Sequence, residues 1–302
     1  MTSVHHYSIW ILLICSGSSV LGGNQPYTEE SVNKFKDLLE KSKNLLVISG
    51  HGMTMETGGV TYRAADQKFR RRFVKDICTH KTFDKNPEIA WQFYGYLQEV
   101  ALWSDPHEGH KAVTRLQKRY LRAGKVFNVA THNDDDLHQR AHTKNVIEMF
   151  GSRFRTKCVK CGFAKENRST TTWDEIVAEK RITTGKNPKD ALPHCPRCDG
   201  LMRPDTIWYD EKMNETIDKQ IEELAQQADL YIELGVTPTI FPSKSYFPII
   251  RKRKIPCAEF NAKTTPNSQD FTFVFTGPLA VTVEDITAYW NRSLIGELII
   301  YD

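Results

Sequence analysis

The stretch NLLVISGHG, residues 44–52, is a short apolar run followed at once by a glycine-rich turn. A short apolar run bounded by a turn is typical of a buried strand. Three later stretches have the same form, and each ends before polar or glycine residues: KVFNVAT at 125–131 before HNDDD, DLYIEL at 229–234 before GVT, and IPCAEF at 255–260 before Asn261. Because the carboxyl ends of parallel strands meet at one edge of a sheet, the four tails are expected to converge on one ligand crevice.

Helical patterns alternate with these strands. Apolar residues recur at helical spacing over about 28–42, 107–123, 214–228 and 243–253. Strands that alternate with helices are typical of an α/β fold with a parallel sheet. We therefore predict a doubly wound, Rossmann-like parallel sheet. Its core is expected over about residues 27–64, 106–150 and 205–302.

Two blocks interrupt the alternation. Residues 65–105 show helical periodicity, most clearly in PEIAWQFYGYLQEV at 87–100, and predict a helical insertion. Residues 151–204 contain four cysteines on either side of a polar, lysine- and threonine-rich loop. This second block predicts a smaller inserted module that a metal ion holds together.

The four cysteines form two C-x-x-C pairs, Cys158 with Cys161 and Cys195 with Cys198. The residues between the pairs, 162–194, are enough to let two tight turns converge on one tetrahedral zinc ion. The alternative is two disulfides in an oxidising compartment. A C-x-x-C turn favours a metal site or a redox pair over a relaxed structural bridge, so one structural zinc is the preferred prediction.

The first 23 residues differ from the rest of the chain. An apolar run, YSIWILLIC at 7–15, is followed by small residues, and no lysine or arginine occurs before Lys34. This pattern predicts a signal peptide over 1–23 and a secreted protein, because a mitochondrial transit peptide is arginine-rich and the first arginine here is Arg63. Mitochondrial targeting is the alternative. The apolar run is too short to span a bilayer, so no membrane span is expected.

Length and charge set broad limits on function. A chain of 302 residues is long enough for one large domain, here expected over 24–302, with smaller units inside it. The formal net charge is only +4, and the basic runs at 70–72 and 251–254 are short. Solvated surface is the simplest explanation of such runs, so no nucleic-acid partner is expected.

Seven segments resemble, in order along the chain, the motifs of the sirtuin family of NAD-dependent protein-lysine deacylases. The similarity covers roughly residues 30–290 and is greatest to the desuccinylase/demalonylase branch. The glycine-rich turn alone would support only a phosphate site or a tight turn. The segments are SGHGMTMETGGVTYR (49–63), THNDDDLHQRA (131–141), NVIEMFGS (145–152), the two cysteine pairs, LMRPDTIWYDE (201–211), LGVT (234–237) and AEFNAKTTP (258–266).

The resemblance implies an NAD site and a site for an acylated protein lysine. Residues implied to hold the phosphates and ribose are Gly50, Gly52, Thr54 and Arg63; those at the nicotinamide are Asn133 and Asp135; those on the adenosine side are Gly235, Thr237 and Asn261. TIWYDE at 206–211 is implied to be the strand along which a substrate peptide pairs, with Ile207, Trp208 and Tyr209 beside the acyl-lysine. Tyr94 and Leu97 fall where the desuccinylase branch has the tyrosine and arginine that bind an acyl carboxylate.

Several positions depart from the family pattern. Phe150 stands where the family has the histidine that removes a proton from a ribose hydroxyl, and phenylalanine cannot accept a proton. His132, implied to lie beside the ribose, is a candidate substitute base because its pKa is near neutrality. His51 replaces a small alanine, Asp134 replaces an apolar residue at the nicotinamide, and Leu97 removes the cation for an acidic acyl group.

The resemblance and its departures together predict a sirtuin-like protein that binds NAD or ADP-ribose. Deacylation, the transfer of the acyl group from lysine to ADP-ribose with release of nicotinamide, is expected to be weakened or lost. One alternative is a residual active NAD-dependent deacylase with altered acyl specificity. Another is a secreted, non-catalytic pseudoenzyme that binds an unknown protein partner.

Overall fold

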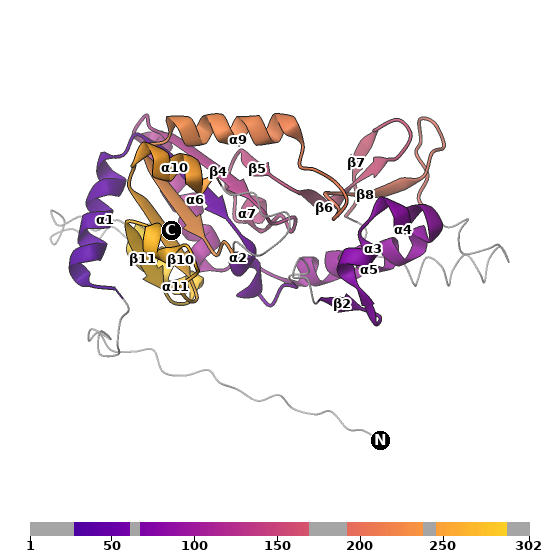
Figure 1. Ribbon diagram of the computed structural model, residues 1–302, viewed down its shortest axis with the longest axis horizontal. Helices are drawn as coiled ribbons and strands as arrows, with labels where there is room; N and C mark the ends of the chain where they lie inside the picture. The colour runs from indigo at the N-terminus through magenta and orange to yellow at the C-terminus, as the bar shows by residue number, and fades with distance from the viewer. Residues whose placement is uncertain (1–26, 61–66, 169–191, 238–245, 289–302) are drawn as a thin grey trace, which may run out of the picture.

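The computed structural model describes residues 27–60, 67–168, 192–237 and 246–288 (Figure 1). Its helices are α1 (Glu29–Lys41), α2 (His51–Met55), α3 (Val74–Ile77), α4 (His80–Lys85), α5 (Pro87–Trp103), α6 (Glu108–Arg122), α7 (Leu137–Arg140), α9 (Glu215–Gln227), α10 (Phe247–Arg253), α11 (Leu279–Thr287) and the 3₁₀ turn η2 (Ser268–Asp270). Its strands are β1 (Asn44–Ser49), β2 (Lys68–Phe69), β3 (Arg72–Phe73), β4 (Val126–Thr131), β5 (Val146–Glu148), β6 (Gly151–Cys158), β7 (Ala164–Glu166), β8 (Met202–Thr206), β9 (Leu230–Leu234), β10 (Cys257–Asn261) and β11 (Phe273–Thr276).

The main sheet is parallel throughout and has the order β11-β10-β9-β1-β4-β5. Numbered along the chain, this is the doubly wound order 3-2-1-4-5-6, in which the direction of winding reverses between β1 and β9. The predicted fold class is confirmed, and all four predicted strands lie at the centre of the sheet. The outer strand β11 was not predicted, because four residues are too few to show a periodicity.

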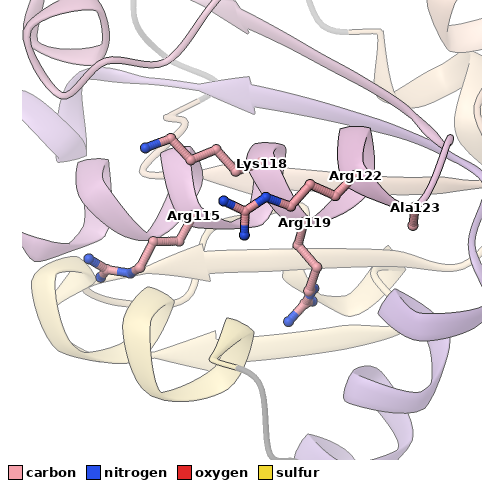
Figure 2. A pocket seen from close by; sticks show the side chains of 5 residues that line it. All are labelled: Arg115, Lys118, Arg119, Arg122 and Ala123. Carbon is pink, nitrogen blue, oxygen red and sulfur yellow. The ribbon is translucent and has the colours of Figure 1, made fainter. Parts of the chain in front are cut away.

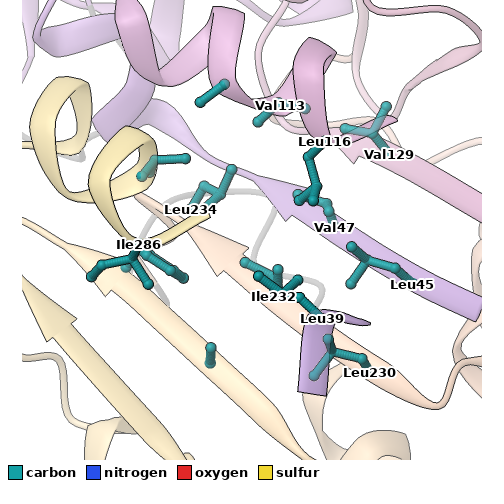
Figure 3. Packing of buried hydrophobic residues seen from close by; sticks show 14 of the residues in the cluster. Leu39, Leu45, Val47, Val113, Leu116, Val129, Leu230, Ile232, Leu234 and Ile286 are labelled. Atoms are coloured by element: carbon teal, nitrogen blue, oxygen red, sulfur yellow. The ribbon is translucent and has the colours of Figure 1, made fainter. Parts of the chain in front are cut away.

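Successive side chains of the central strands enter two different cores. Leu45 and Val47 of β1 lie in a cluster with residues of α1, α6 and α11 on one face of the sheet (Figure 3). Leu46 and Ile48 point the other way and pack with residues of α9 and α10. A strand with both faces covered must be apolar at every position, which explains why NLLVIS is a continuous rather than an alternating run.

Capping residues explain where the long helices begin. The Oδ1 atom of Asn214 accepts hydrogen bonds from the backbone N–H groups of Thr216 and Ile217 at the start of α9. The Nδ1 atom of His107 accepts one from Gly109 at the start of α6. These bonds satisfy donors that have no partner inside the helix. The predicted helices over 28–42, 107–123 and 214–228 are each confirmed to within a residue or so, whereas 243–245 lie outside the described residues.

The helical insertion and the cysteine block pack against each other and share one hydrophobic core. Strand β6 pairs antiparallel with both β7 and β8. Helices α3, α4 and α5 pack on this sheet, so that Trp91, Phe93 and Trp208 share one buried cluster with Cys158 and Cys195. The sequence separates these segments by the whole of α6 and β4, and local patterns therefore do not show that they meet.

Two predictions concern regions that the structure covers only in part. Within the described ranges, no helix combines the length and the apolar character that crossing a bilayer requires. The predicted signal peptide over 1–23 lies outside the described residues.

Candidate functional site

The tails of four strands meet at one edge of the sheet. Ser49 at the end of β1 is paired in register with Thr131 of β4 and with Leu234 of β9. The backbone continues this contact beyond the strands, because Gly50 donates a hydrogen bond to the carbonyl of Leu234 and Gly235 donates one to Phe260. The predicted convergence of the tails is confirmed. They meet where the winding of the sheet reverses, which is the predicted place of the ligand crevice.

Three glycines form the floor of this crevice. A Cβ atom at Gly50 would lie 2.5 Å from the carbonyl oxygen of Gly235, and one at Gly52 would lie 2.7 Å from the Cα of Gly235. Gly52 also donates a hydrogen bond to that carbonyl. Backbone packs directly on backbone here, so a side chain at any of the three positions would clash.

Substitution of Gly235 by alanine is expected to destabilise the protein by at least about 2 kcal/mol and to abolish nucleotide binding. The residue has a φ of +61°, and its added Cβ would lie 2.7 Å from the Cα of Gly52. Gly124→Ala is the matched control, because Gly124 has a similar φ of +69° with no atom within 4 Å of its Cβ position. Urea unfolding measures the loss in the free energy of unfolding for both variants. Both carry the backbone strain, so a larger loss in Gly235→Ala is due to the steric clash. Equal losses would contradict the clash.

Two residues assigned to the nicotinamide, Asn133 and Asp135, are buried at the same edge. The Nδ2 atom of Asn133 donates to the carbonyl of Gly50 at 3.0 Å, while its Oδ1 atom is buried with no hydrogen-bond partner among the described residues. Asp135 accepts hydrogen bonds from the Thr54 hydroxyl and the backbone of Leu137. Burial raises the pKa of Asp135, an effect that the charge of Arg153 partly offsets. An unsatisfied buried acceptor is costly unless a ligand donates to it, so Asn133 fits a ligand-binding role.

An aromatic stack fills the position that the resemblance assigns to the family base. Phe150 is buried, and its ring lies parallel to that of His132, with centroids 5.2 Å apart and an interplanar angle of 19°. The ring of His51 lies 6.4 Å from that of His132. The structure thus brings together three of the departures from the family pattern, and only the two histidines among them can carry a proton.

The fourth departure, Asp134, forms a buried ion pair. Its carboxylate accepts hydrogen bonds from the Nε and Nη2 atoms of Arg153 on β6, the first at 3.0 Å. Arg153 was not identified from the sequence. An unpaired acid in a buried position requires a cation nearby, but nothing local shows that the cation lies on β6.

The acyl-lysine positions lie on α5 and in the segment that follows β8. The Tyr94 hydroxyl accepts a hydrogen bond from Thr206 at 2.6 Å, and Leu97 and Trp208 are buried. The predicted strand over 206–211 is wrong beyond its first residue, because β8 ends at Thr206. After that point Ile207 donates to the carbonyl of Phe150 and Tyr209 donates to that of Cys78, so the backbone leaves the β6 ladder.

The adenosine-side residues have different environments. The Nδ2 atom of Asn261 donates to the carbonyl of Val236 at 2.9 Å and thereby holds the turn that contains Gly235. Thr237 is exposed. Arg63 lies outside the described residues.

A serine and a histidine that sequence reasoning missed support the same edge. Ser49 is joined to the Nε2 atom of His138 on α7 at 2.8 Å. Burial lowers the pKa of His138 to about 4, so the ring is neutral at pH 7. His110 of α6 packs edge-on against it, with centroids 4.9 Å apart. The one signal in the sequence was the His138 that follows HNDDD, and a lone histidine does not indicate its partner.

The four predicted metal ligands form a single cluster. All four Sγ atoms lie within 4.8 Å of one another, with Cys158 and Cys198 at 3.5 Å and Cys161 and Cys195 at 3.6 Å. Zn–S bonds of about 2.3 Å in a tetrahedron place sulfurs about 3.8 Å apart, whereas a disulfide requires about 2.05 Å. The cysteines are not disulfide-bonded, and a Cβ at Gly200 would lie 3.0 Å from the Cys158 sulfur. This donor set fits one structural zinc, as predicted.

Comparison with known proteins gives the family. The family model described as Sir2 family matches residues 50–242. The NAD-dependent protein deacylase sirtuin-5, mitochondrial, of Canis lupus familiaris is 33% identical over 260 residues, which are 84% of each chain. This chain belongs to the Sir2 family. The NAD-dependent protein deacylase of Pyrococcus abyssi is 33% identical over 217 residues, or 71% of this chain and 80% of that protein.

Solved structures agree with the family assignment. A Sir2 homologue in complex with NAD superimposes with a TM-score of 0.72 at 25% identity, covering 84% of this chain and 92% of that one. A mutant Sir2 homologue in complex with ADP-ribose gives a TM-score of 0.71 at 26% identity, covering 84% and 94%. The resemblance to the sirtuin family and to its desuccinylase branch is confirmed by the Sir2 match and by the sirtuin-5 relatives.

A basic hollow of this Sir2-family chain lies far from the crevice. It has a volume of about 510 Å³ and is lined by Arg115, Lys118, Arg119, Arg122 and Ala123 (Figure 2). Ala123 ends α6, and β4 begins at Val126, so this end of α6 lies at the amino edge of the sheet. The crevice is at the opposite, carboxyl edge.

The buried carboxyl group of Glu233, two residues before Gly235, is expected to make the stability of the protein depend on pH. Burial raises the pKa of Glu233 from 4.5 to about 7, with a further contribution from the charge of Glu259 on β10. An acid with a raised folded pKa stabilises below its unfolded pKa and loses that contribution as pH rises through about 7. Relative to Glu233→Gln, the wild type should lose about 2–3 kcal/mol between pH 5 and pH 8.5.

Denaturant unfolding at the two pH values measures this loss. The exposed Glu223 of α9 supplies the control variant Glu223→Gln, whose stability should follow that of the wild type at both pH values. A constant difference between wild type and Glu233→Gln would contradict the assignment.

Proposed function

We propose that this Sir2-family chain binds NAD or ADP-ribose in the crevice and that its deacylase activity is weakened or lost. The observation that carries the proposal is the contrast within one site. The glycine floor and the unsatisfied Oδ1 atom of Asn133 remain, while the ring of Phe150 stands at the base position. Relatives at about 30% identity are named NAD-dependent protein deacylases, which supports the cofactor.

Each residue of the crevice has a defined role in this proposal. NAD, when bound, supplies ADP-ribose as the acyl acceptor and nicotinamide as the leaving group. Asn133 and Asp135 hold the nicotinamide side, and Thr54, which is bonded to Asp135, orients that carboxylate. Gly50 and Gly52, whose N–H groups are bonded to the carbonyls of Leu234 and Gly235, leave the phosphates and ribose unobstructed by side chains, and Arg63 holds them. Phe150 cannot remove a proton from a hydroxyl, and the loss of a general base typically lowers a rate by about 10²- to 10⁴-fold.

The test is calorimetric titration of the zinc-loaded protein with NAD and with ADP-ribose. The same preparation is then incubated with acetyl- and succinyl-lysine peptides and analysed by mass spectrometry. Binding of either nucleotide with little or no turnover supports the proposal. Failure of both nucleotides to bind would overturn it, and turnover at an ordinary enzymatic rate would overturn the claim of weakened catalysis.

Residual deacylation with His132 as the base is a second candidate function. The imidazole of His132 lies against the Phe150 ring and is therefore next to the place that the family histidine occupies. Any turnover by the wild type should then disappear in His132→Ala and be retained in His51→Ala. A rate that survives the loss of His132 would exclude it as the base.

The proposed substrate is an acylated protein, and the proposed compartment is the mitochondrion. An acylated protein lysine is the proposed substrate, held beside Tyr94 and Trp208; an unidentified protein partner is the alternative.

The sirtuin-5 relatives are named mitochondrial, which favours the mitochondrial alternative over secretion. Expression of the full chain with a carboxyl-terminal fluorescent tag, followed by sequencing of the mature amino terminus, distinguishes the two.

A further inference from the structure

The Asp134–Arg153 pair is one of the most deeply buried ion pairs of the described residues. The side chains are 4% and 3% exposed, and the guanidinium approaches the carboxylate with two of its nitrogens. The backbone N–H of Arg153 also donates to the carbonyl of Asp134 at 3.0 Å. A guanidinium that donates twice to a carboxylate forms a strong, directional contact, so Arg153 is held in one orientation.

Arg153 also joins the two halves of the site. Its Nη1 atom donates to the carbonyl of Leu97 on α5 at 3.1 Å, and its own carbonyl accepts a hydrogen bond from Gln98 of the same helix. Asp134 lies between Asn133 and Asp135, the nicotinamide positions. The guanidinium therefore lies between the nicotinamide loop and the helix that carries the acyl positions Tyr94 and Leu97.

The charges around this point are unfavourable for a further carboxylate. Asp134, Asp135 and Asp136 follow one another, and all three are buried. Arg153 is paired with the first, and Arg168 donates to Asp136 at 2.5 Å. An acidic acyl group entering here would meet three buried carboxylates, and the two guanidinium groups that donate to them are already bound.

We propose that Asp134 is a built-in substitute for the carboxylate of an acidic acyl-lysine: it occupies Arg153 from within the chain and makes the site select uncharged acyl groups. This inference rests on the proposed function of the crevice. It goes beyond the missing cation at position 97, because it identifies a guanidinium that is bonded to the backbone of Leu97 and the residue that withholds it. Removal of the Asp134 carboxylate should convert the site into one that accepts an acidic acyl group.

Binding of two peptides tests the proposal directly. Wild type and Asp134→Ala are titrated, in the presence of ADP-ribose, with an acetyl-lysine peptide and a succinyl-lysine peptide of the same sequence. The wild type should bind the acetyl peptide more tightly. In Asp134→Ala the ratio of the two dissociation constants should move toward the succinyl peptide by roughly tenfold or more, the effect of one charge-assisted contact. An unchanged ratio, or a wild type that prefers the succinyl peptide, would overturn the proposal.

A second readout does not depend on peptide or nucleotide binding. Asp134→Ala leaves Arg153 without its carboxylate, so sodium succinate should raise its melting temperature more than sodium chloride of equal ionic strength does. Asp136→Ala is the matched control: it removes a neighbouring carboxylate whose partner, Arg168, is 46% exposed, and it should show no such preference. Should Asp134→Ala not fold, Asp134→Asn keeps the side-chain size and is expected to show the same shift in peptide ratio.

The two readouts separate the inference from the proposed function. Absence of ADP-ribose binding in every variant would count against the nucleotide site, while a succinate response in Asp134→Ala would still support an available Arg153. Nucleotide binding without a succinate response or a change in peptide ratio would show that the pair is structural only, and the proposal would be wrong.

Discussion

Replacement of Cys195 by serine is expected to unfold the unit formed by α3–α5 and β6–β8. Structural zinc contributes about 10 kcal/mol or more to small metal-held units, which is as large as the whole stability of a typical domain. Cys195 is buried in the same cluster as Trp91, Phe93 and Trp208. Loss of the metal should therefore expose this core and destroy the acyl-lysine side of the crevice with it.

Zinc content, near-ultraviolet circular dichroism and thermal unfolding measure this effect. Cys195→Ser should contain less than one zinc per chain and lose the near-ultraviolet signal of the buried aromatic residues. Cys257→Ser is the control, because Cys257 is a buried cysteine of β10 outside the cluster and should keep its zinc. Purified wild type without zinc, or a Cys195→Ser protein that keeps one zinc per chain and the wild-type melting temperature, would show that the four cysteines do not hold the metal.

The substitution Phe150→His is expected to increase the deacylase activity of the protein. A histidine at this position places an imidazole at the crevice, and a restored general base is expected to raise the rate of NAD-dependent deacylation by roughly 10²- to 10⁴-fold. The side chain is smaller than phenylalanine and can keep the parallel contact with His132, so the fold should tolerate it. Some stability will be lost because Phe150 belongs to the core beneath α9 and α10.

Mass spectrometry of acetyl-lysine peptide turnover, at saturating NAD, compares three proteins. Phe150→Leu removes the aromatic ring without adding a base and should be as inactive as the wild type. Equal rates in wild type and Phe150→His would contradict the view that residue 150 limits catalysis.

The four-cysteine unit and the crevice are connected through residue 150. The zinc unit and the nucleotide crevice share Phe150, whose carbonyl accepts a hydrogen bond from Ile207 at the end of the zinc-held sheet. Damage to the zinc unit is therefore expected to disturb residue 150, whereas Phe150→His should leave the zinc content unchanged.

Much of the candidate site could be predicted because its signals are local. The polar or glycine residues of the four strand tails directly follow apolar runs. Each cysteine pair spans only four residues, so its metal-ligand spacing can be recognised locally. The strand predicted at 206–211 failed for the converse reason. Its pattern of apolar residues is that of a strand, but the backbone N–H groups of Ile207 and Tyr209 find their acceptors on Phe150 and Cys78, which are remote in sequence.

The sequence by itself determined the doubly wound sheet, the four-cysteine cluster and the phenylalanine at position 150, where the resemblance places a histidine. Each of these features depends on residue type and short-range spacing, which can be recognised without knowledge of the tertiary contacts. Only the tertiary structure decided that the two insertions share one core, that His132 stacks on Phe150, and that Asp134 is neutralised by Arg153. Those contacts join segments from different elements, and a buried charge or ring is satisfied by whichever partner the fold brings within about 3–5 Å.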